Sequence, residues 1–280
     1  MGKPVVAILG GRGMLGTDVA ARCTQQGFDV RVYDMPEFDL TRQECREQAM
    51  ESADVVLNCA AYTNVDGAES HPEQAQRVNA EAVGRLAELV ARQDKWLLHF
   101  STDFVFDGTL DRPYVETDTP NPINEYGRSK LAGERLLQGS GCRYCIVRLD
   151  WTYGRHGQNF ITKLVDRART SGALRVVDDQ IGSPTATAEV ARATLDLIRG
   201  RVEGMFHLAN AGFASRYAIA EFVVERLGLG VEPAPCRTSD YPSPAARPLN
   251  SRFDCSKIQP FLAGPLVPWQ EPLEEFLRQL

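Results

Sequence analysis

The chain has 280 residues, of which 43% are hydrophobic and 24% charged, a balance typical of a soluble globular protein. Its formal net charge of −6 argues against a nucleic-acid partner, whose binding surface would be basic. No apolar run reaches the length of a membrane span, and the apolar residues 5–9 lead directly into glycines rather than to a cleavage site. We therefore expect a cytoplasmic protein with no membrane partner.

The cysteines and histidines indicate neither a disulfide framework nor a metal site. The seven cysteines are scattered, and the C-x-x-C pair Cys142 and Cys145 opens an apolar strand without a second pair nearby. We expect reduced, partly buried thiols. The four histidines show no metal-ligand spacing, and no metal is predicted.

The N-terminal stretch has the order strand, glycine turn, helix that a dinucleotide-binding motif requires. An apolar strand over residues 4–9 comes before Gly10, Gly13 and Gly16, and a helix is predicted over residues 17–26. Glycines allow close approach of the backbone, and the helix N-terminus offers free N–H groups to a pyrophosphate. The position in the first βα unit favours a nucleotide site over a simple tight turn.

A second strand over residues 29–34 ends in Asp34, which lies roughly 20 residues past the glycines. A carboxylate at this place can accept hydrogen bonds from the adenosine ribose hydroxyls and would repel a ribose 2′-phosphate. NADH is therefore expected to fit better than NADPH. A polar helix should follow, with Asp39 or Thr41 as its N-cap.

Two further strands are expected to end where a ligand could bind. A buried strand over residues 53–61 ends in small residues that would let a cofactor approach the backbone, and an amphipathic helix is predicted within residues 73–93. The next strand, residues 96–103, ends in S-T-D. In an open α/β sheet ligands bind outside the carboxyl ends of the strands, so these polar side chains fall where chemistry is expected. A turn-forming cluster is the alternative.

Tyr126 and Lys130 lie four residues apart among good helix formers, and this spacing puts both side chains on one helix face. An ammonium beside a phenol favours the phenolate, so Lys130 is expected to lower the pKa of Tyr126 from about 10 toward working pH. Such a phenol can donate a proton to a carbonyl oxygen as a hydride arrives at the carbon. The pattern alone is frequent by chance, and an ordinary surface helix would also show it.

The second half of the chain changes in composition. The sequence predicts a strand over 142–149, a helix over 187–198, a strand over 204–209, a helix capped by Ser215 and ending at Leu227, and a helix over 271–280. Residues 233–250 hold five prolines, which predicts an extended loop and a candidate lid. The fold class is α/β, a Rossmann-like doubly wound parallel sheet with a small interleaved C-terminal substrate-binding region. We assign residues 1–150 to the dinucleotide-binding domain and residues 151–280 mainly to substrate binding, partly interleaved with the first domain.

Several stretches occur together that point to one family. Beside the glycine turn they are N-C-A-A-Y-T-N-V-D at 58–66, S-T-D-F-V-F-D-G at 101–108, Y-G-R-S-K-L-A-G-E at 126–134, W-T-Y-G at 151–154, D-Q-I-G-S-P-T at 179–185 and R-P-L-N-S at 247–251. The last two are much more particular than the first three, which many nucleotide-sugar enzymes share. Over nearly its whole length the chain resembles the dTDP-4-dehydrorhamnose reductase family, within the extended short-chain dehydrogenase/reductases.

The resemblance implies a role for each matching position. Thr102, Tyr126 and Lys130 would form the catalytic triad, with Tyr126 as proton donor, Thr102 on the sugar carbonyl and Lys130 on the nicotinamide ribose. Substrate contacts are expected from Val65, Thr102, Asp103, Phe104 and Trp151, with Arg247 and Asn250 toward the nucleotide diphosphate. The residues expected around NADH or NADPH are Gly10, Gly13, Met14, Leu15, Gly16, Asp34, Asp39, Leu40, Cys59, Ala60, Ala61, Tyr62, Ser101, Tyr126 and Lys130.

The implied reaction is reduction of the 4-keto group of a dTDP-6-deoxy-hexulose, dTDP-4-dehydrorhamnose, to dTDP-L-rhamnose. Phe104 stands where the family usually has Tyr, and Leu149-Asp150 stand where it usually has Thr-Ser; both changes flank the sugar pocket, so a different nucleotide-4-ketosugar stays open. A cofactor-binding regulatory subunit that resembles the methionine adenosyltransferase beta chain also stays open. A homodimer is compatible with the resemblance; Asp18 and Glu189 resemble two positions of a magnesium-bridged dimer but do not establish a metal.

Overall fold

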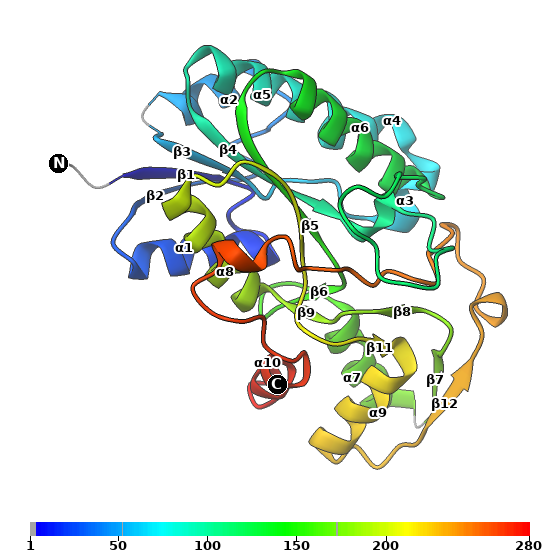
Figure 1. Cartoon of the computed structure of the whole chain (residues 1–280). Helices are drawn as coiled ribbons and strands as arrows, with labels where there is room; N and C mark the ends of the chain where they lie inside the picture. The colour runs from blue at the N-terminus through cyan, green and yellow to red at the C-terminus, as the bar shows by residue number, and fades with distance from the viewer. Residues whose placement is uncertain (1–3, 52, 172) are drawn as a thin grey trace.

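The computed structural model describes residues 4–51, 53–171 and 173–280, and its centre is a six-stranded parallel sheet (Figure 1). The strands lie in the order β10-β5-β4-β3-β1-β2. Their bounds are β1 Val5–Leu9, β2 Asp29–Tyr33, β3 Val55–Asn58, β4 Trp96–Thr102, β5 Arg143–Leu149 and β10 Gly204–Leu208. The order changes direction between β1 and β3, and at such a point an open α/β sheet forms its ligand crevice.

Helices cover both faces of the sheet (Figure 1). They are α1 (Met14–Gln25) and α8 (Thr187–Gly200) on one face, and α2 (Gln43–Met50), α5 (Ala82–Arg92) and α6 (Glu125–Gly139) on the other. Side chains alternate along a strand, so Val6 and Ile8 of β1 enter the core under α1 and α8, while Ala7 and Leu9 enter the core under α2 and α5. Burial on both faces explains the continuous apolar runs of the strands.

The chain between β3 and β4 forms α3 (Val65–Ser70), α4 (Pro72–Gln76), one π-helical turn (Arg77–Glu81) and then α5. The predicted amphipathic helix within 73–93 is therefore present, with a π turn in its middle. A short 3₁₀ turn, Asp103–Val105, follows β4 and leads into the loop before α6. These connections all lie at the carboxyl ends of the strands, where the site is expected.

A separate apolar core lies below the sheet in Figure 1. It is built by α7 (Phe160–Ser171), α9 (Arg216–Leu227), α10 (Gln270–Leu277), β7 (Leu174–Val177) and the short pair β6 (Thr152–Tyr153) and β9 (Thr185–Ala186). A further pair joins β8 (Ile181–Gly182) and β11 (Ala214–Ser215). The chain after residue 150 thus builds this core and also supplies β10 and α8 to the sheet; the domain division at residue 150 stays a prediction.

Most elements occur where the sequence predicts them, and two expectations are wrong. The N-cap of α2 is Arg42, because Asp39 instead accepts hydrogen bonds from the backbone N–H and the hydroxyl of Thr41, both at 2.8 Å, and closes a turn before the helix. The proline-rich stretch is not all loop: Pro233–Cys236 form β12, which pairs with β7 in parallel. As an edge strand, β12 tolerates two prolines.

Ser215 caps α9 as predicted, since its side chain accepts from the backbone N–H of Ala218 at 3.0 Å. All seven cysteines are free thiols in this structure, and five of them are buried. Within the part of the chain that the structure describes, no helix combines the length and apolarity needed to cross a bilayer.

Candidate active site

A cavity of about 740 Å³ lies at the carboxyl ends of β1, β3 and β4. Every residue predicted for the cofactor lines it, from Gly10 and Asp34 to Tyr62 and Ser101. The predicted triad and Val65, Asp103, Phe104 and Trp151 line it as well. The structure thus brings residues from position 10 to position 151 into one hollow.

The glycine turn at one end of the cavity presents free backbone donors. Gly10 has φ +74°, and a Cβ there would lie 2.6 Å from the backbone nitrogen of Ala60; a Cβ on Gly16 would lie 2.2 Å from the Gly10 carbonyl oxygen. No side chain caps α1, whose N-cap is Gly13, so the first N–H groups of this helix have no protein partner of their own. Uncapped amides with a positive dipole end fit a pyrophosphate.

Asp34 is held rigidly at the next strand end. Its Oδ2 accepts from the backbone N–H of Arg12 at 2.7 Å, and its Oδ1 accepts from that of Met35 at 2.8 Å. Each carboxylate oxygen keeps a further lone pair for a ribose hydroxyl. The Arg12 guanidinium is bound to exposed Glu37 at 2.8 Å.

Tyr126 is placed by the tight docking of α6. The side chain of Asn124 caps this helix by accepting from the backbone N–H of Gly127 at 2.8 Å. A Cβ on Gly127 would lie 2.1 Å from the carbonyl oxygen of Phe104, so only glycine allows the helix to approach the loop after β4 this closely. Tyr126 consequently packs edge-on against the Phe104 ring, with centroids 5.7 Å apart.

The Lys130 ammonium lies in a buried position and is directed at the sheet. Its Nζ donates to the carbonyl oxygen of Phe100 at 2.7 Å and lies 3.4 Å from Nε2 of His99. Burial lowers the pKa of Lys130 to about 8, although the nearby Glu134 carboxylate opposes this shift. Lys130 is therefore positioned by a backbone carbonyl and titrates more readily than an exposed lysine.

The expected effect of Lys130 on Tyr126 is wrong in this structure. Burial raises the pKa of the Tyr126 phenol, the Asp103 carboxylate raises it further, and only an interaction with the Thr102 hydroxyl acts in the opposite direction. Lys130 is not among the groups that shift this pKa, and its ammonium donates to the Phe100 carbonyl instead. The phenol accordingly keeps its proton, which is the state that a proton donor needs.

Thr102 and Asp103 form a buried polar pair beside the phenol. The Thr102 hydroxyl donates to Oδ1 of Asp103 at 2.9 Å, and the Ser251 hydroxyl donates to Oδ2 at 2.5 Å. Burial raises the pKa of Asp103, and these two hydrogen bonds oppose the rise. Ser251 comes from the R-P-L-N-S stretch, which thus supports the site from the second half of the chain.

The structure does not bring Arg247 and Asn250 to the cavity wall. Arg247 forms an ion pair with Asp66 at 2.9 Å. Asn250 donates from Nδ2 to the carbonyl oxygens of Leu110 and Arg112 at 2.7 and 2.8 Å, which uses both of its N–H groups to fasten the loop before α6. A contact of these two residues with a diphosphate stays a prediction.

Sequence reasoning missed part of the cavity wall. Among the missed residues are Arg77, Gln158, Asn159 and Arg216. Asn159 begins α7: its Oδ1 accepts from the backbone N–H groups of Ile161 and Thr162, and an Asn before an apolar helical run is a signal that could have found it. For Arg216 the capping Ser215 marks the start of α9, but no signal in the sequence places that helix end against Trp151.

The family model of the RmlD substrate binding domain matches residues 5–280. This chain belongs to that family. A dTDP-4-dehydrorhamnose reductase of Mycolicibacterium smegmatis is 38% identical over 275 residues, which cover 96% of this chain and 84% of that protein. The family relationship predicted from the sequence is confirmed.

Two solved structures of family members have the same fold. The dTDP-4-dehydrorhamnose reductase of Bacillus anthracis in complex with NADP is 31% identical, with a TM-score of 0.95 and full coverage of both chains. The corresponding reductase of Clostridium acetobutylicum is 32% identical, with a TM-score of 0.93, and the match covers 98% of this chain and 99% of that one.

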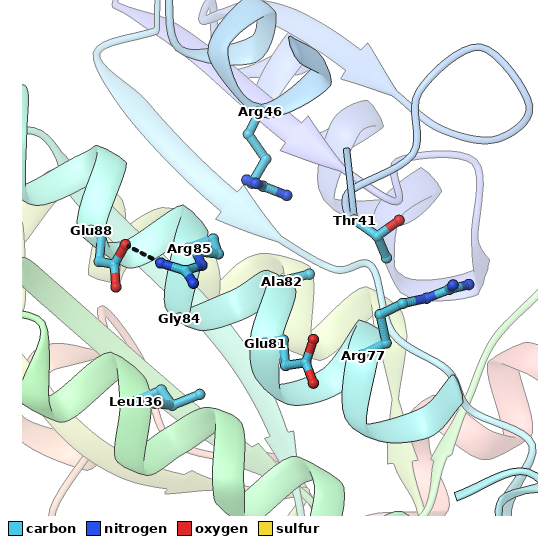
Figure 2. Close-up of a pocket in the computed structure, with 9 residues that line it drawn as sticks. All are labelled: Thr41, Arg46, Arg77, Glu81, Ala82, Gly84, Arg85, Glu88 and Leu136. Atoms are coloured by element: carbon cyan, nitrogen blue, oxygen red, sulfur yellow. Dashed lines mark hydrogen bonds and ion pairs between the residues drawn. The ribbon is translucent and has the colours of Figure 1, made fainter. Parts of the chain in front are cut away.

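A smaller hollow of about 420 Å³ lies between α2, α5 and α6 (Figure 2). Thr41 and Arg77 line both this hollow and the larger cavity. Arg46 donates to a backbone carbonyl at 2.7 Å, and Arg85 is paired with Glu88 at 3.3 Å, drawn as a dashed line. The hollow mixes both signs of charge and contains no member of the predicted triad, which lines the larger cavity.

The acidic residues considered for a magnesium-bridged dimer have protein partners. Asp18 accepts a hydrogen bond from the Thr187 hydroxyl, and Glu189 is paired with Arg192 at 2.9 Å. Among residues 4–51, 53–171 and 173–280, no group of three or more His, Cys, Asp or Glu side chains could hold a metal ion.

Proposed function

We propose that this protein reduces the 4-keto group of dTDP-4-dehydrorhamnose to give dTDP-L-rhamnose, with NADH or NADPH as the hydride donor. One observation carries the proposal: the uncapped glycine turn and the group Thr102, Tyr126 and Lys130 line the same cavity. Its support is the family membership and the name that the reductases of M. smegmatis and B. anthracis share.

In this proposal each residue has one task. A reduced nicotinamide supplies the hydride to carbon 4 when it is bound. The Tyr126 phenol donates its proton to the carbonyl oxygen, which completes the alcohol, and burial keeps that proton in place beforehand. The Thr102 hydroxyl, which donates to Oδ1 of Asp103 in this structure, would turn its one proton to the same oxygen when the substrate binds. Lys130, which lines the same cavity, would hold the nicotinamide ribose.

We further propose that NADH is preferred, because the fixed Asp34 carboxylate accepts from ribose hydroxyls and repels a 2′-phosphate. The B. anthracis relative binds NADP, so this preference would be a property of the individual chain.

The test is a panel of dTDP-, UDP- and GDP-4-ketosugars with NADH and with NADPH, followed by the loss of nicotinamide absorbance. Tyr126→Phe should lower kcat on the best substrate by roughly 10²–10⁴-fold and leave cofactor binding intact. Tyr153→Phe is the matched control, because it also removes a buried phenolic oxygen, one that has no hydrogen-bond partner and lies outside the cavity. A Tyr126→Phe protein with near wild-type turnover would remove the mechanism. A wild type that binds NADH but reduces nothing in the panel would favour a regulatory subunit.

A further inference from the structure

Arg216, the first residue of α9, lines the cavity, and its guanidinium lies over two aromatic rings. Its guanidinium carbon lies 3.5 Å from the centroid of the Trp151 ring and 4.7 Å from that of Phe160. Trp151 itself has φ +41°, a left-handed conformation that is costly for a large side chain and is maintained only where the surroundings require it. The fold therefore holds the guanidinium in one orientation.

Among the residues that the structure describes, none accepts a hydrogen bond from the N–H groups of this guanidinium. Within the described chain the Arg216 side chain makes no hydrogen bond and no ion pair; its only close partners are the two rings. Asp150 and Asp103 are near enough to support its charge, and they oppose the burial that lowers the pKa of Arg216 to about 10. The side chain is half-buried, so its N–H groups face the cavity and are available to a ligand there.

Among the described residues, a buried carboxylate oxygen and a buried hydroxyl also have no hydrogen-bond partner. Oδ1 of Asp150, a residue with no exposed surface, has no hydrogen-bond partner, whereas the other carboxylate oxygen accepts from the backbone N–H of Ser183 at 2.5 Å. The buried hydroxyl of Ser101, which lines the cavity, has no partner either. Protein interiors rarely leave buried polar groups unpaired, and a polar ligand in the cavity can pair the Ser101 hydroxyl, whereas Asp150 does not line the cavity.

The location of these groups fixes which part of a ligand they meet. Arg216 lines the cavity together with Thr102, Asp103 and Trp151, and its guanidinium lies over the Trp151 ring. The family resemblance implies that these three residues contact the substrate, so we expect the guanidinium to lie beside the sugar of the proposed substrate.

We propose that Arg216 is a specificity-determining residue that donates two parallel hydrogen bonds to neighbouring oxygen atoms of the sugar ring. This inference rests on the proposed function, because it assigns the sugar end of that substrate. The planar fork of a guanidinium matches two adjacent oxygens, and stacking on Trp151 presets its plane, so little rotamer entropy is lost on binding. A ring that lacks one of these oxygens leaves an N–H group unpaired and binds less tightly.

The experiment measures dissociation constants by calorimetry for dTDP, dTDP-glucose and its 2-deoxy and 3-deoxy forms. Arg216→Met should raise the dissociation constant of dTDP-glucose by about 10- to 100-fold and that of dTDP itself by less than about twofold. At least one deoxy form should bind more weakly than dTDP-glucose to the wild type, and that difference should vanish in Arg216→Met. Arg216→Lys keeps the charge but not the fork, and it should still lose most of the discrimination between the sugars.

Arg226→Met is the matched control, because Arg226 also lies over an aromatic ring of α9, that of Phe222 at 5.0 Å, but outside the cavity. It should bind all four compounds like the wild type. The inference fails if Arg216→Met has a cooperative melting curve, binds all four compounds as the wild type does and still discriminates against the deoxy forms. This holds even where the reductase assay succeeds. If the wild type reduces no 4-ketosugar, the proposed function fails, and a loss of sugar affinity in Arg216→Met would still identify the contact. A wild type that binds none of the dTDP compounds would overturn both.

Discussion

At the scale of single residues, Lys130 is the group whose protonation should limit activity at high pH. Burial lowers its pKa to about 8, and the ammonium is charged below that pH and neutral above it. The Tyr126 phenol, with its raised pKa, stays protonated through the same range. We therefore expect kcat/KM to fall as the pH rises above about 8, because the neutral amine holds the cofactor ribose less well.

Lys130→Arg tests this assignment, since a guanidinium does not lose its proton in this range. The variant should be slower than the wild type, because the longer fork does not fit a site built around the Phe100 carbonyl, yet its rate should not fall between pH 8 and 10. If the rate of Lys130→Arg still falls above about pH 8 as it does in the wild type, the loss of activity at high pH would instead be caused by deprotonation of Tyr126.

Asp34 gives a second prediction at this scale. Asp34→Ala removes the acceptor for the ribose hydroxyls and also the repulsion of a 2′-phosphate, so the ratio of kcat/KM for NADH over that for NADPH should fall. Part of any loss with NADH would come from the two backbone amides left without their acceptor. Asp34→Asn, which keeps an acceptor oxygen without the charge, separates the two effects. A wild type with clearly higher kcat/KM for NADPH would contradict the expected preference.

The residues that the sequence could predict are those whose role follows from local spacing. Gly10 and Tyr126 belong to short motifs with a fixed strand or helix context, and both line the cavity. The sequence could not give the direction of the Tyr126 pKa shift, because this depends on burial and on the Asp103 carboxylate nearby. It could not place Arg216 on Trp151 either, since that contact joins two elements more than 60 residues apart in the chain.

At the scale of secondary-structure elements, the position of α6 depends on its close packing against the π turn before α5. A Cβ on Gly133 would lie 2.1 Å from the carbonyl oxygen of Asn79. The side chain of Asn79 holds Tyr62 of the cavity wall, accepting from its backbone N–H at 2.8 Å, and donates to the Ser129 hydroxyl at 2.9 Å. A shift of α6 would therefore disturb the cofactor end of the cavity together with Tyr126.

Gly133→Ala should lower the free energy of unfolding by about 1–3 kcal/mol, the usual cost of overpacking, and should reduce kcat/KM. Gly139→Ala is the control on the same helix: an added Cβ meets nothing within 4 Å there, so the change should be neutral or stabilising by up to about 1 kcal/mol. Urea denaturation of both variants measures the difference. Equal stabilities would show that α6 can move away from the π turn without cost.

At the scale of the whole molecule, one edge of the sheet is formed by β10, a strand that comes late in the chain. The doubly wound sheet could be predicted from the apolar runs and the glycine turn, whereas β10 is short and reaches its place beside β5 only through tertiary contacts. One buried network joins it to the rest: Arg148 of β5 binds Glu134 of α6 in a pair of hydrogen bonds at 2.9 and 2.6 Å and lies 3.4 Å from His207 of β10. The network connects the edge of the sheet to the helix that carries Tyr126.

His207 makes this network sensitive to acid. Its Nδ1 donates to the Tyr114 carbonyl oxygen at 3.1 Å, and its Nε2 faces a guanidinium N–H of Arg148, which requires a neutral ring that accepts there. Burial and the Arg148 charge lower the pKa of His207 to about 3, against about 6.5 in the unfolded chain. Between these values the unfolded state binds the proton and the folded state does not, so the contribution of His207 to stability is complete above pH 6.5 and is lost as the pH falls toward 3.

His207→Gln should flatten the dependence of unfolding free energy on pH between about 4.5 and 6.5, by as much as about 1.4 kcal/mol per pH unit, while lowering stability at pH 7. Some slope will remain, because His99 is also buried with a lowered pKa, whereas Asp150, whose pKa burial raises, acts with the opposite sign. His71→Gln, at an exposed position, should leave the slope unchanged. Urea denaturation at a series of pH values gives the slopes, and a His207→Gln protein with the wild-type slope would show that His207 takes up a proton in the folded state without cost to the network.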